Sequence, residues 1–310
     1  MRRTLAAPVP GAVMTLFRGV AAFPITPMDD DGRVDTGALR VLLERLAQAK
    51  VNAIVLLGST GAYAYLSRAE RRVAVETAVH QIAGRVPVVV GIGALRTDEA
   101  IRLGQDATDC GADAVLLAPV SYTPLTDDEV FAHFAAVAEA VGLPLCIYNN
   151  PGTTHFNIGD ELLARLSRIA NVVAVKNPAP EPDVMHAGLL AWRHAAADGF
   201  SVGCSVDWRA TAALQAGADC WYSVAAGLFP APCMEILAAV RAGDNARVLE
   251  LDRQLQPLWA LFVAYSSIRV MYAAADLLGI CRAVPPRPVL PLAPEIQSHI
   301  GRTLETLGLT

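Results

Sequence analysis

One lysine stands at the end of a strongly apolar segment, where a charged side chain is unusual. Residues 172–178 read VVAVKNP, a composition typical of a buried parallel strand. Because side chains alternate along a strand, Lys176 is expected on the same side as Val172 and Ala174. If that side faces a dry interior, the amine can give up its proton and attack a carbonyl carbon, which forms an imine (Schiff base). A strand-end lysine that extends to solvent is the ordinary alternative.

The choice of basic residues supports the chemical interpretation. Of the 25 basic residues, 23 are arginine and only Lys50 and Lys176 are lysine. Arginine stays protonated, whereas a desolvated lysine can act as a nucleophile. Lys50 closes a helical pattern and fits an ordinary surface role. Lys176 is therefore the candidate nucleophile.

Two polar motifs follow other apolar segments and could share a site with this lysine. Gly58-Ser59-Thr60-Gly61 comes directly after apolar residues 54–57, and its backbone N–H groups and hydroxyls suit a carboxylate. Tyr148 ends the apolar run 145–148, and its phenol can transfer protons as a general acid or base. Each motif also has an ordinary interpretation, as a tight Gly- and Ser-rich loop and as a packed aromatic side chain.

Eight short β-rich segments, with helical patterns between them, are predicted to position these residues. Near-continuous apolar strands are typical of parallel sheets covered by helices, and eight such units at about 30-residue spacing favour an α/β fold of the (β/α)8 TIM barrel type. A doubly wound open sheet is the competitor, but the glycine-rich phosphate turn expected after its first strand is absent. The predicted strands are Gly19–Ile25, Asn52–Leu57, Val86–Gly91, Asp113–Ala118, Leu145–Tyr148, Val172–Lys176, Ser201–Cys204 and Asp219–Val224.

Helical patterns also follow the last predicted strand, at Pro232–Ala242, Asp244–Ala264 and Ser266–Leu278. We therefore expect three parts: an N-terminal extension at 1–14 that is poorly ordered, a catalytic barrel at 15–228, and a C-terminal helical extension at 229–310 that packs on the barrel. Among the barrel helices, Ser67 with Glu70 three residues later predicts a capped helix start.

Composition excludes several classes of function. The chain has 310 residues, a net charge of −5 and no cluster of basic residues, which argues against a nucleic-acid partner. No unbroken apolar run reaches the length of a membrane span, and no signal peptide is expected, so the predicted location is cytoplasmic. The six cysteines are spread singly and are expected to be reduced, and the six histidines form no ligand-like pair, so no metal is expected.

Taken together, these motifs resemble the dihydrodipicolinate synthase / N-acetylneuraminate lyase family of class I aldolases. The resemblance spans roughly Phe17 to Leu278. The matching blocks are Phe23-Pro24-Ile25-Thr26-Pro27, Gly58-Ser59-Thr60-Gly61, Gly111-Ala112-Asp113-Ala114, Tyr148-Asn149-x-Pro151, Val173-x-Val175-Lys176, and Gly217-Ala218-Asp219 with Ser223-Val224.

The resemblance implies a mechanism. Lys176 would form a Schiff base with pyruvate or a longer 2-oxo acid, and the backbone and hydroxyls of Gly58, Ser59 and Thr60 would hold its carboxylate. Tyr148 would transfer protons while a C–C bond to an aldehyde-type acceptor forms or breaks. Neither a cofactor nor a metal is implied. A homodimer or homotetramer is implied too, with subunit contacts near the loop that holds Ser121 and Tyr122.

Several positions depart from the family pattern. Ala62 stands where an acidic residue is usual, and Thr153 stands where the dipicolinate-forming members carry an arginine for the second substrate's carboxylate. Ser121 falls on the tyrosine of a proton relay across a subunit contact, which Tyr122 could replace only if the loop shifts by one residue. Tyr222 is also atypical and could narrow the pocket over the imine.

These departures disfavour dihydrodipicolinate synthesis, because a threonine hydroxyl cannot replace a bidentate guanidinium. The polar residues Asn150, Thr153, Thr154 and His155 favour a hydroxylated acceptor without a second carboxylate. Two alternatives stay open. One is a Schiff-base dehydratase that acts on a sugar-derived 2-oxo acid, and the other is a non-catalytic binding paralogue.

Overall fold

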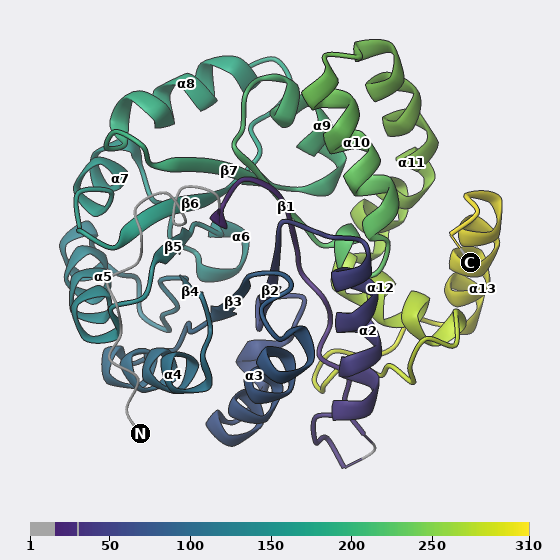
Figure 1. Ribbon diagram of the computed structural model, residues 1–310, viewed down its shortest axis with the longest axis horizontal. Coiled ribbons are helices and arrows are strands. Elements are labelled where there is room, and N and C mark those ends of the chain that lie inside the picture. Colours follow the sequence, from purple (N-terminus) through teal and green to yellow (C-terminus); the bar gives the residue numbers. More distant parts are fainter. Residues whose placement is uncertain (1–15, 30, 310) are drawn as a thin grey trace.

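The computed structural model describes residues 16–29 and 31–309, and within them the chain forms a closed β-barrel ringed by helices (Figure 1). All neighbouring strands are parallel, and β1 (Gly19–Ala22) pairs with β8 (Cys220–Ser223) to close the ring. This arrangement confirms the predicted TIM barrel. The expected N-terminal extension at 1–14 lies outside the described residues.

The eight strands fall where the apolar segments predicted them, and most are shorter than the predicted ranges. The sixth is the longest because it continues two residues past Lys176. The strands are β1 (Gly19–Ala22), β2 (Ala53–Leu56), β3 (Val88–Gly91), β4 (Ala114–Leu117), β5 (Leu145–Tyr148), β6 (Val172–Pro178), β7 (Ser201–Ser205) and β8 (Cys220–Ser223).

Helices connect successive strands and cover the outside of the barrel. Ser67 caps α3 in a reciprocal capping box with Glu70, as the sequence predicted, and Thr126 caps α5 in the same way with Glu129. The helices before β8 are α2 (Thr36–Gln48), α3 (Arg68–Ile82), α4 (Thr97–Cys110), α5 (Asp127–Val141), α6 (Pro151–Thr154), α7 (Asp160–Leu166), α8 (Met185–Ala195) and α9 (Asp207–Gln215).

The barrel interior is filled by a compact group of mostly small side chains, among them Ala21, Ala53, Ala114 and Ala174. The outward faces of the strands pack under the helices in a separate and larger core. One detail of the predicted alternation is wrong. The pairing of β5 with β6 shifts register between Leu145 and Cys146, so Val172 belongs to the outer core instead of facing inward with Ala174.

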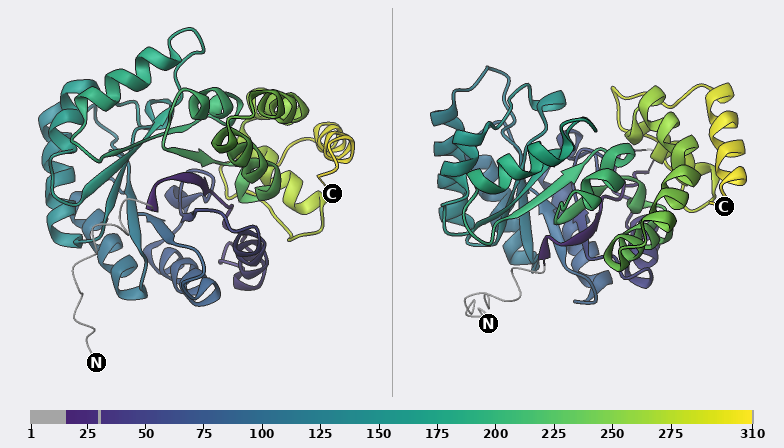
Figure 2. Two further views of the ribbon diagram at one scale, coloured as in Figure 1. Left: turned by 45° about the horizontal axis from the view of Figure 1, so that its top comes forward. Right: turned by 90° about the horizontal axis from the view of Figure 1, so that it is seen from above.

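Four helices follow β8, namely α10 (Pro230–Ala242), α11 (Asn245–Tyr265), α12 (Ser267–Leu277) and α13 (Pro294–Thr306). Helix α10 contacts β1 and α9, the place of an eighth barrel helix. We therefore propose that the barrel continues to Ala242, so the expected division at 228/229 falls within the eighth β/α unit. The remaining helices gather on one side of the barrel, with α13 outermost (Figure 2).

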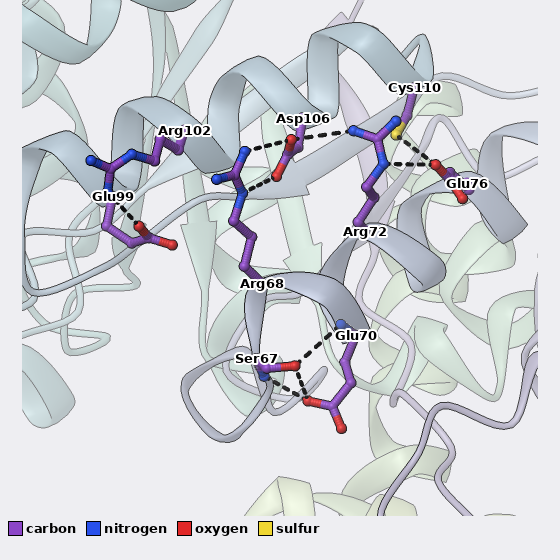
Figure 3. Close-up of polar contacts among 9 residues, drawn as sticks. All are labelled: Ser67, Arg68, Glu70, Arg72, Glu76, Glu99, Arg102, Asp106 and Cys110. Carbon is purple, nitrogen blue, oxygen red and sulfur yellow. Dashed lines mark hydrogen bonds and ion pairs between the residues drawn. The ribbon is translucent and has the colours of Figure 1, made fainter.

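Ion pairs link the exposed faces of neighbouring helices. Between α3 and α4, Asp106 accepts hydrogen bonds from Arg68 and Arg72, and Arg72 also pairs with Glu76 (Figure 3). The Arg68 guanidinium lowers the pKa of the Asp106 carboxyl. Such solvent-exposed pairs contribute little each to stability, so the burial of apolar surface dominates this fold.

The six cysteines are free thiols, five of them buried and Cys110 partly exposed. Within residues 16–29 and 31–309, no single helix has the length and apolar character of a membrane span. Only α11 and α12 taken together meet those criteria, and they are bent by 120° at their junction.

Candidate active site

Lys176 points into the barrel and is almost completely buried, with 4% of its surface exposed. Its Nζ lies 3.7 Å from the ring centroid of Tyr148 and 4.1 Å from that of Phe23. No carboxylate of the described residues forms a salt bridge with it.

The phenol of Tyr148 connects the lysine to the predicted anion-binding turn. Its oxygen lies 3.1 Å from the Ser59 hydroxyl and accepts a hydrogen bond from Nδ2 of Asn150 at 2.9 Å. Since the amide donates to the phenol oxygen, the phenol proton is free to point toward Ser59 or a ligand. Tyr148, at the end of β5, pairs in register with Lys176 on β6.

The turn at 58–61 is held close to the lysine by tight packing on Phe23. A Cβ at Gly58 would lie 2.6 Å from the Phe23 ring, so only glycine allows this approach. Leu57 adopts a left-handed backbone conformation with φ 56°, which turns the chain sharply after β2. The hydroxyl of Thr26 then donates to the Gly61 carbonyl at 2.8 Å. The turn is therefore fixed at Gly58 by the Phe23 ring and at Gly61 by the Thr26 hydroxyl.

An amide pair fixes the register of β5 and β6 one residue beyond the functional side chains. Nδ2 of Asn149 donates to Oδ1 of Asn177 at 3.0 Å, and both side chains are buried. Oδ1 of Asn149 accepts from the backbone N–H of Ile158 at 3.1 Å. Asn177, directly after the lysine, thereby helps to align the strands where Tyr148 and Lys176 face each other.

A cavity of about 380 Å³ opens beside this cluster. From the barrel, its lining includes Ser59, Tyr63 and Thr153, and from the C-terminal helices it includes Arg269. Lys176 does not line it, so Ser59 and the Tyr148 phenol connect the cavity to the amine. The volume is in the range of small-molecule sites.

Tyr63 and Arg71 stabilise the wall of this cavity. The Arg71 guanidinium lies 5.2 Å from the Tyr63 ring centroid and donates to the carbonyls of Leu66 and Gly93. Burial raises the pKa of Tyr63 to about 12, with a further contribution from Tyr148, so the Tyr63 phenol stays protonated at neutral pH. Burial also lowers the pKa of Arg71.

The other predicted site residues lie inside the barrel, on the floor of the site, and in a loop at the rim of the barrel. Tyr222 lies inside the barrel, fully buried, with its hydroxyl 3.3 Å from Sγ of Cys146 and its ring edge-on to Phe23. Burial raises its pKa well above the usual value. Ser121 lies at the rim, with its hydroxyl donating to the Thr123 carbonyl, and Tyr122 is 97% exposed. Tyr222 thus forms floor packing, and Ser121 and Tyr122 lie outside the 380 Å³ cavity.

The remaining predicted site residues lie in the turn at 58–61 and in the loop after β5. Thr60 is buried within the turn at 58–61. Hydroxyls of Thr153 and Thr154 both donate to the Asn150 carbonyl, which keeps the loop after β5 compact. Over the part of the chain that the structure describes, no group of three or more His, Cys, Asp or Glu side chains is placed to hold a metal ion.

Comparison with known proteins shows the family. The sequence profile of the Dihydrodipicolinate synthetase family matches residues 16–307. The chain belongs to this family. Among its members, the 4-hydroxy-tetrahydrodipicolinate synthase of Acidiphilium cryptum is 35% identical over 297 residues, which cover 95% of this chain and 99% of that protein.

Solved structures of dihydrodipicolinate synthases share the fold closely. That from Agrobacterium tumefaciens is 51% identical with a TM-score of 0.93, over 95% of this chain and 99% of that one. The chloride-inhibited enzyme of Acinetobacter baumannii, solved with pyruvate, is 30% identical with a TM-score of 0.86, over 96% and 100% of the two chains. The family resemblance predicted from the sequence motifs is confirmed.

Three features of this family member were missed by sequence reasoning. The contact of Asn150 with the Tyr148 phenol could have been suspected, because the two residues are only two positions apart. The bond from Thr26 to the turn carried a weaker signal, its place in the Phe23–Pro27 block. Arg269 carried none, since it enters the cavity from a helix more than 90 residues after the lysine.

Proposed function

We propose that the protein is a class I aldolase or lyase that forms a Schiff base between Lys176 and pyruvate or a related 2-oxo acid. The observation that carries the proposal is the buried amine of Lys176 against the Tyr148 ring, with the Tyr148 hydroxyl bonded to Ser59. Family membership supports it, as does the relative that was solved with pyruvate.

The proposed reaction begins with attack of the Lys176 amine on the carbonyl carbon of the 2-oxo acid. The resulting carbinolamine loses water to give the imine, and Tyr148 supplies the proton that the departing hydroxyl needs. Loss of a proton from the adjacent carbon gives an enamine, whose carbon attacks an aldehyde carbonyl to form the C–C bond. Hydrolysis of the new imine releases the product and regenerates the amine, and cleavage runs through the same steps in reverse.

The residues around the amine fit these steps. The N–H groups and hydroxyls of Ser59 and Thr60 hold the carboxylate of the 2-oxo acid. Asn150 keeps the Tyr148 phenol oriented toward Ser59. The flexible four-carbon stem of Lys176 lets its amine leave the face of the Tyr148 ring when a carbonyl arrives.

For the second substrate, we propose a hydroxylated aldehyde. Thr153 lines the cavity. In dipicolinate-forming members of the family, the resemblance leads us to expect an arginine at this position. Curated relatives at 32–35% identity are nevertheless named 4-hydroxy-tetrahydrodipicolinate synthase. Our proposal is that this chain prefers another acceptor. A homodimer or homotetramer with contacts near Ser121 and Tyr122, and a cytoplasmic location, stay predictions.

The test is trapping and product analysis. Incubation with pyruvate and borohydride is expected to add a stable mass increment at Lys176, and Lys176→Arg is expected to abolish it because the charge persists while the nucleophile is lost. Lys50→Arg is the matched control and should leave trapping intact. Absence of an adduct with every 2-oxo acid tried would leave a non-catalytic binding protein as the better description.

Product analysis then separates the two chemistries that share the imine. A panel of sugar-derived 2-oxo acids is offered to the enzyme. Release of a three-carbon 2-oxo acid identifies an aldolase, whereas loss of water with the carbon chain intact identifies a dehydratase.

A further inference from the structure

A single charged side chain lines the cavity beside the proposed site, counting the residues that the structure describes. Arg269 is half-buried in the first turn of α12, and the lining residues opposite it on the barrel include Ser59, Ala62 and Thr153. Ala62 offers no carboxylate to it. A guanidinium that forms no ion pair with a neighbouring carboxylate at a small-molecule cavity favours anionic ligands.

The backbone directs Arg269 to this place. The chain bends by 120° between α11 and α12, and Ser266 at the bend has φ 71°, a conformation that non-glycine residues rarely adopt. Three residues beyond Arg269, on the same helix face, the buried hydroxyl of Tyr272 donates to the Thr26 carbonyl at 3.0 Å. The hydroxyl of Thr26 in turn holds the Gly61 carbonyl. Helix α12 is therefore fixed relative to the anion-binding turn.

The Arg269 guanidinium has no polar partner among the described residues. Neither a hydrogen bond nor an ion pair joins it to another residue of 16–29 and 31–309. Other arginines at the surface, such as Arg68, Arg72 and Arg85, are paired with carboxylates. A partly desolvated guanidinium without a partner lacks the hydrogen bonds that five donors can make, and a substrate oxyanion would supply them.

We infer that Arg269 is a specificity-determining residue that binds a terminal oxyanion, a carboxylate or a phosphate, on the second substrate. The inference rests on the proposed function, in which the turn at Ser59 and Thr60 already holds the carboxylate of the 2-oxo acid. The acceptor class is thereby narrowed to a hydroxylated aldehyde with an anionic group at its far end. This departs from the expectation, drawn from the loop after β5, of an acceptor without a second carboxylate, because Arg269 on α12 would bind the anion in place of that loop.

The test compares aldehydes of equal length that differ in the terminal group. Succinic semialdehyde and 4-hydroxybutanal are each condensed with pyruvate by the wild type and by Arg269→Gln, and kcat/KM is measured from pyruvate consumption. The ratio of the carboxylate to the hydroxyl compound is expected to fall about 10- to 100-fold in the variant, the range for loss of a charge-assisted hydrogen bond. Arg269→Lys should retain part of the ratio. Glyceraldehyde 3-phosphate and glyceraldehyde form a second pair that distinguishes phosphate from carboxylate.

A binding measurement covers the case in which none of these aldehydes reacts. Pyruvate is first reduced onto Lys176 with borohydride, which fills the anion-binding turn, and the adduct is titrated with butyrate and with inorganic phosphate by calorimetry. Arg269→Gln is expected to weaken binding of one of these anions at least tenfold. Arg253→Gln, an exposed arginine on α11, is the control and should bind as the wild type does.

The outcomes separate this inference from the proposed function. Absence of a pyruvate adduct in the wild type defeats the proposed function itself. An adduct that forms normally, with aldehyde ratios and anion binding equal in wild type and Arg269→Gln, defeats only the role of Arg269. A tenfold rise in the pyruvate concentration needed for trapping in that variant would assign the guanidinium to pyruvate and also overturn the inference.

Discussion

Replacement of Tyr148 by phenylalanine isolates the contribution of one hydroxyl. The ring that covers the Lys176 amine at 3.7 Å stays, and only the hydrogen bonds to Ser59 and Asn150 are lost. If this phenol is the proton-transfer group, kcat is expected to fall about 10²- to 10⁴-fold. Pyruvate trapping at Lys176 should become slower but still reach completion, because the nucleophile is intact.

The stability change should be small by comparison. Two lost hydrogen bonds cost about 1–2 kcal/mol. At about 2.1 cal/mol/K per residue, the unfolding entropy of a 310-residue chain is near 0.65 kcal/mol/K, so Tm is expected to fall by about 2–3 °C.

Steady-state kinetics, the rate of borohydride trapping and calorimetry together measure these effects. Tyr265→Phe, which removes a hydroxyl that makes no hydrogen bond to the described residues, is the matched control for both rate and Tm. A kcat for Tyr148→Phe within about threefold of the wild type would refute the assignment of proton transfer to this phenol. A fall in Tm of ten degrees or more would show instead that the hydroxyl is structural.

Three further outcomes follow from individual contacts. Gly58→Ala should raise the pyruvate concentration needed for half-maximal trapping, because the new methyl group meets the Phe23 ring at 2.6 Å; an unchanged value would show that the turn tolerates displacement. Asn177→Ala should lower the free energy of unfolding by about 1–3 kcal/mol in urea titrations, because a buried amide pair is broken, and a loss under 0.5 kcal/mol would contradict this. For Glu44, hydrogen bonds from Arg85 hold the pKa at about 2, below its value of about 4.3 in the unfolded chain, so the stabilisation is present above pH 5 and lost as pH falls toward 2. Glu44→Gln should therefore be less stable than the wild type at pH 7 and equal to it near pH 2, and a difference independent of pH would be inconsistent with the ion pair.

The barrel itself could be predicted from the sequence because its strands are buried on both sides. Such strands are short apolar runs, and their spacing alone indicates the closed parallel topology. The predicted alternation failed at Val172, since a register shift depends on how β5 and β6 pair and leaves no mark in the composition of either strand. On our proposal that the barrel continues to Ala242, the expected division at 228/229 falls between β8 and α10, because helix patterns do not reveal which strand a helix will pack on.

The site was predictable to the extent that its residues lie at or near the C-terminal ends of strands. Tyr148 and Lys176 could be paired because neighbouring parallel strands present these ends at one edge of the sheet. Arg269 could not be placed in the cavity from the sequence. Its position depends on the local bend at Ser266 and on the hydrogen bond from Tyr272 to Thr26, which joins segments more than 200 residues apart. Tyr222 could be identified as unusual, but its burial in the floor depends on the absence of a side chain at Gly203, whose Cβ would lie 2.5 Å from the tyrosine ring.

Helix α12 lines part of the cavity, so selectivity for the second substrate can change through the C-terminal segment. The amine, the phenol and the anion-binding turn are encoded between residues 58 and 176, whereas Ile268, Arg269 and Val289 reach the same cavity from the last quarter of the chain. Recombination at a point such as Gly243 would exchange the cavity residues of the C-terminal segment and leave residues 58–176 unchanged. Chimeras between relatives joined there should inherit the covalent chemistry and the loop at Thr153 from the first parent, and the acceptor contacts of α12 from the second. The segment after residue 243 is therefore a place where acceptor preference can change separately from the covalent chemistry.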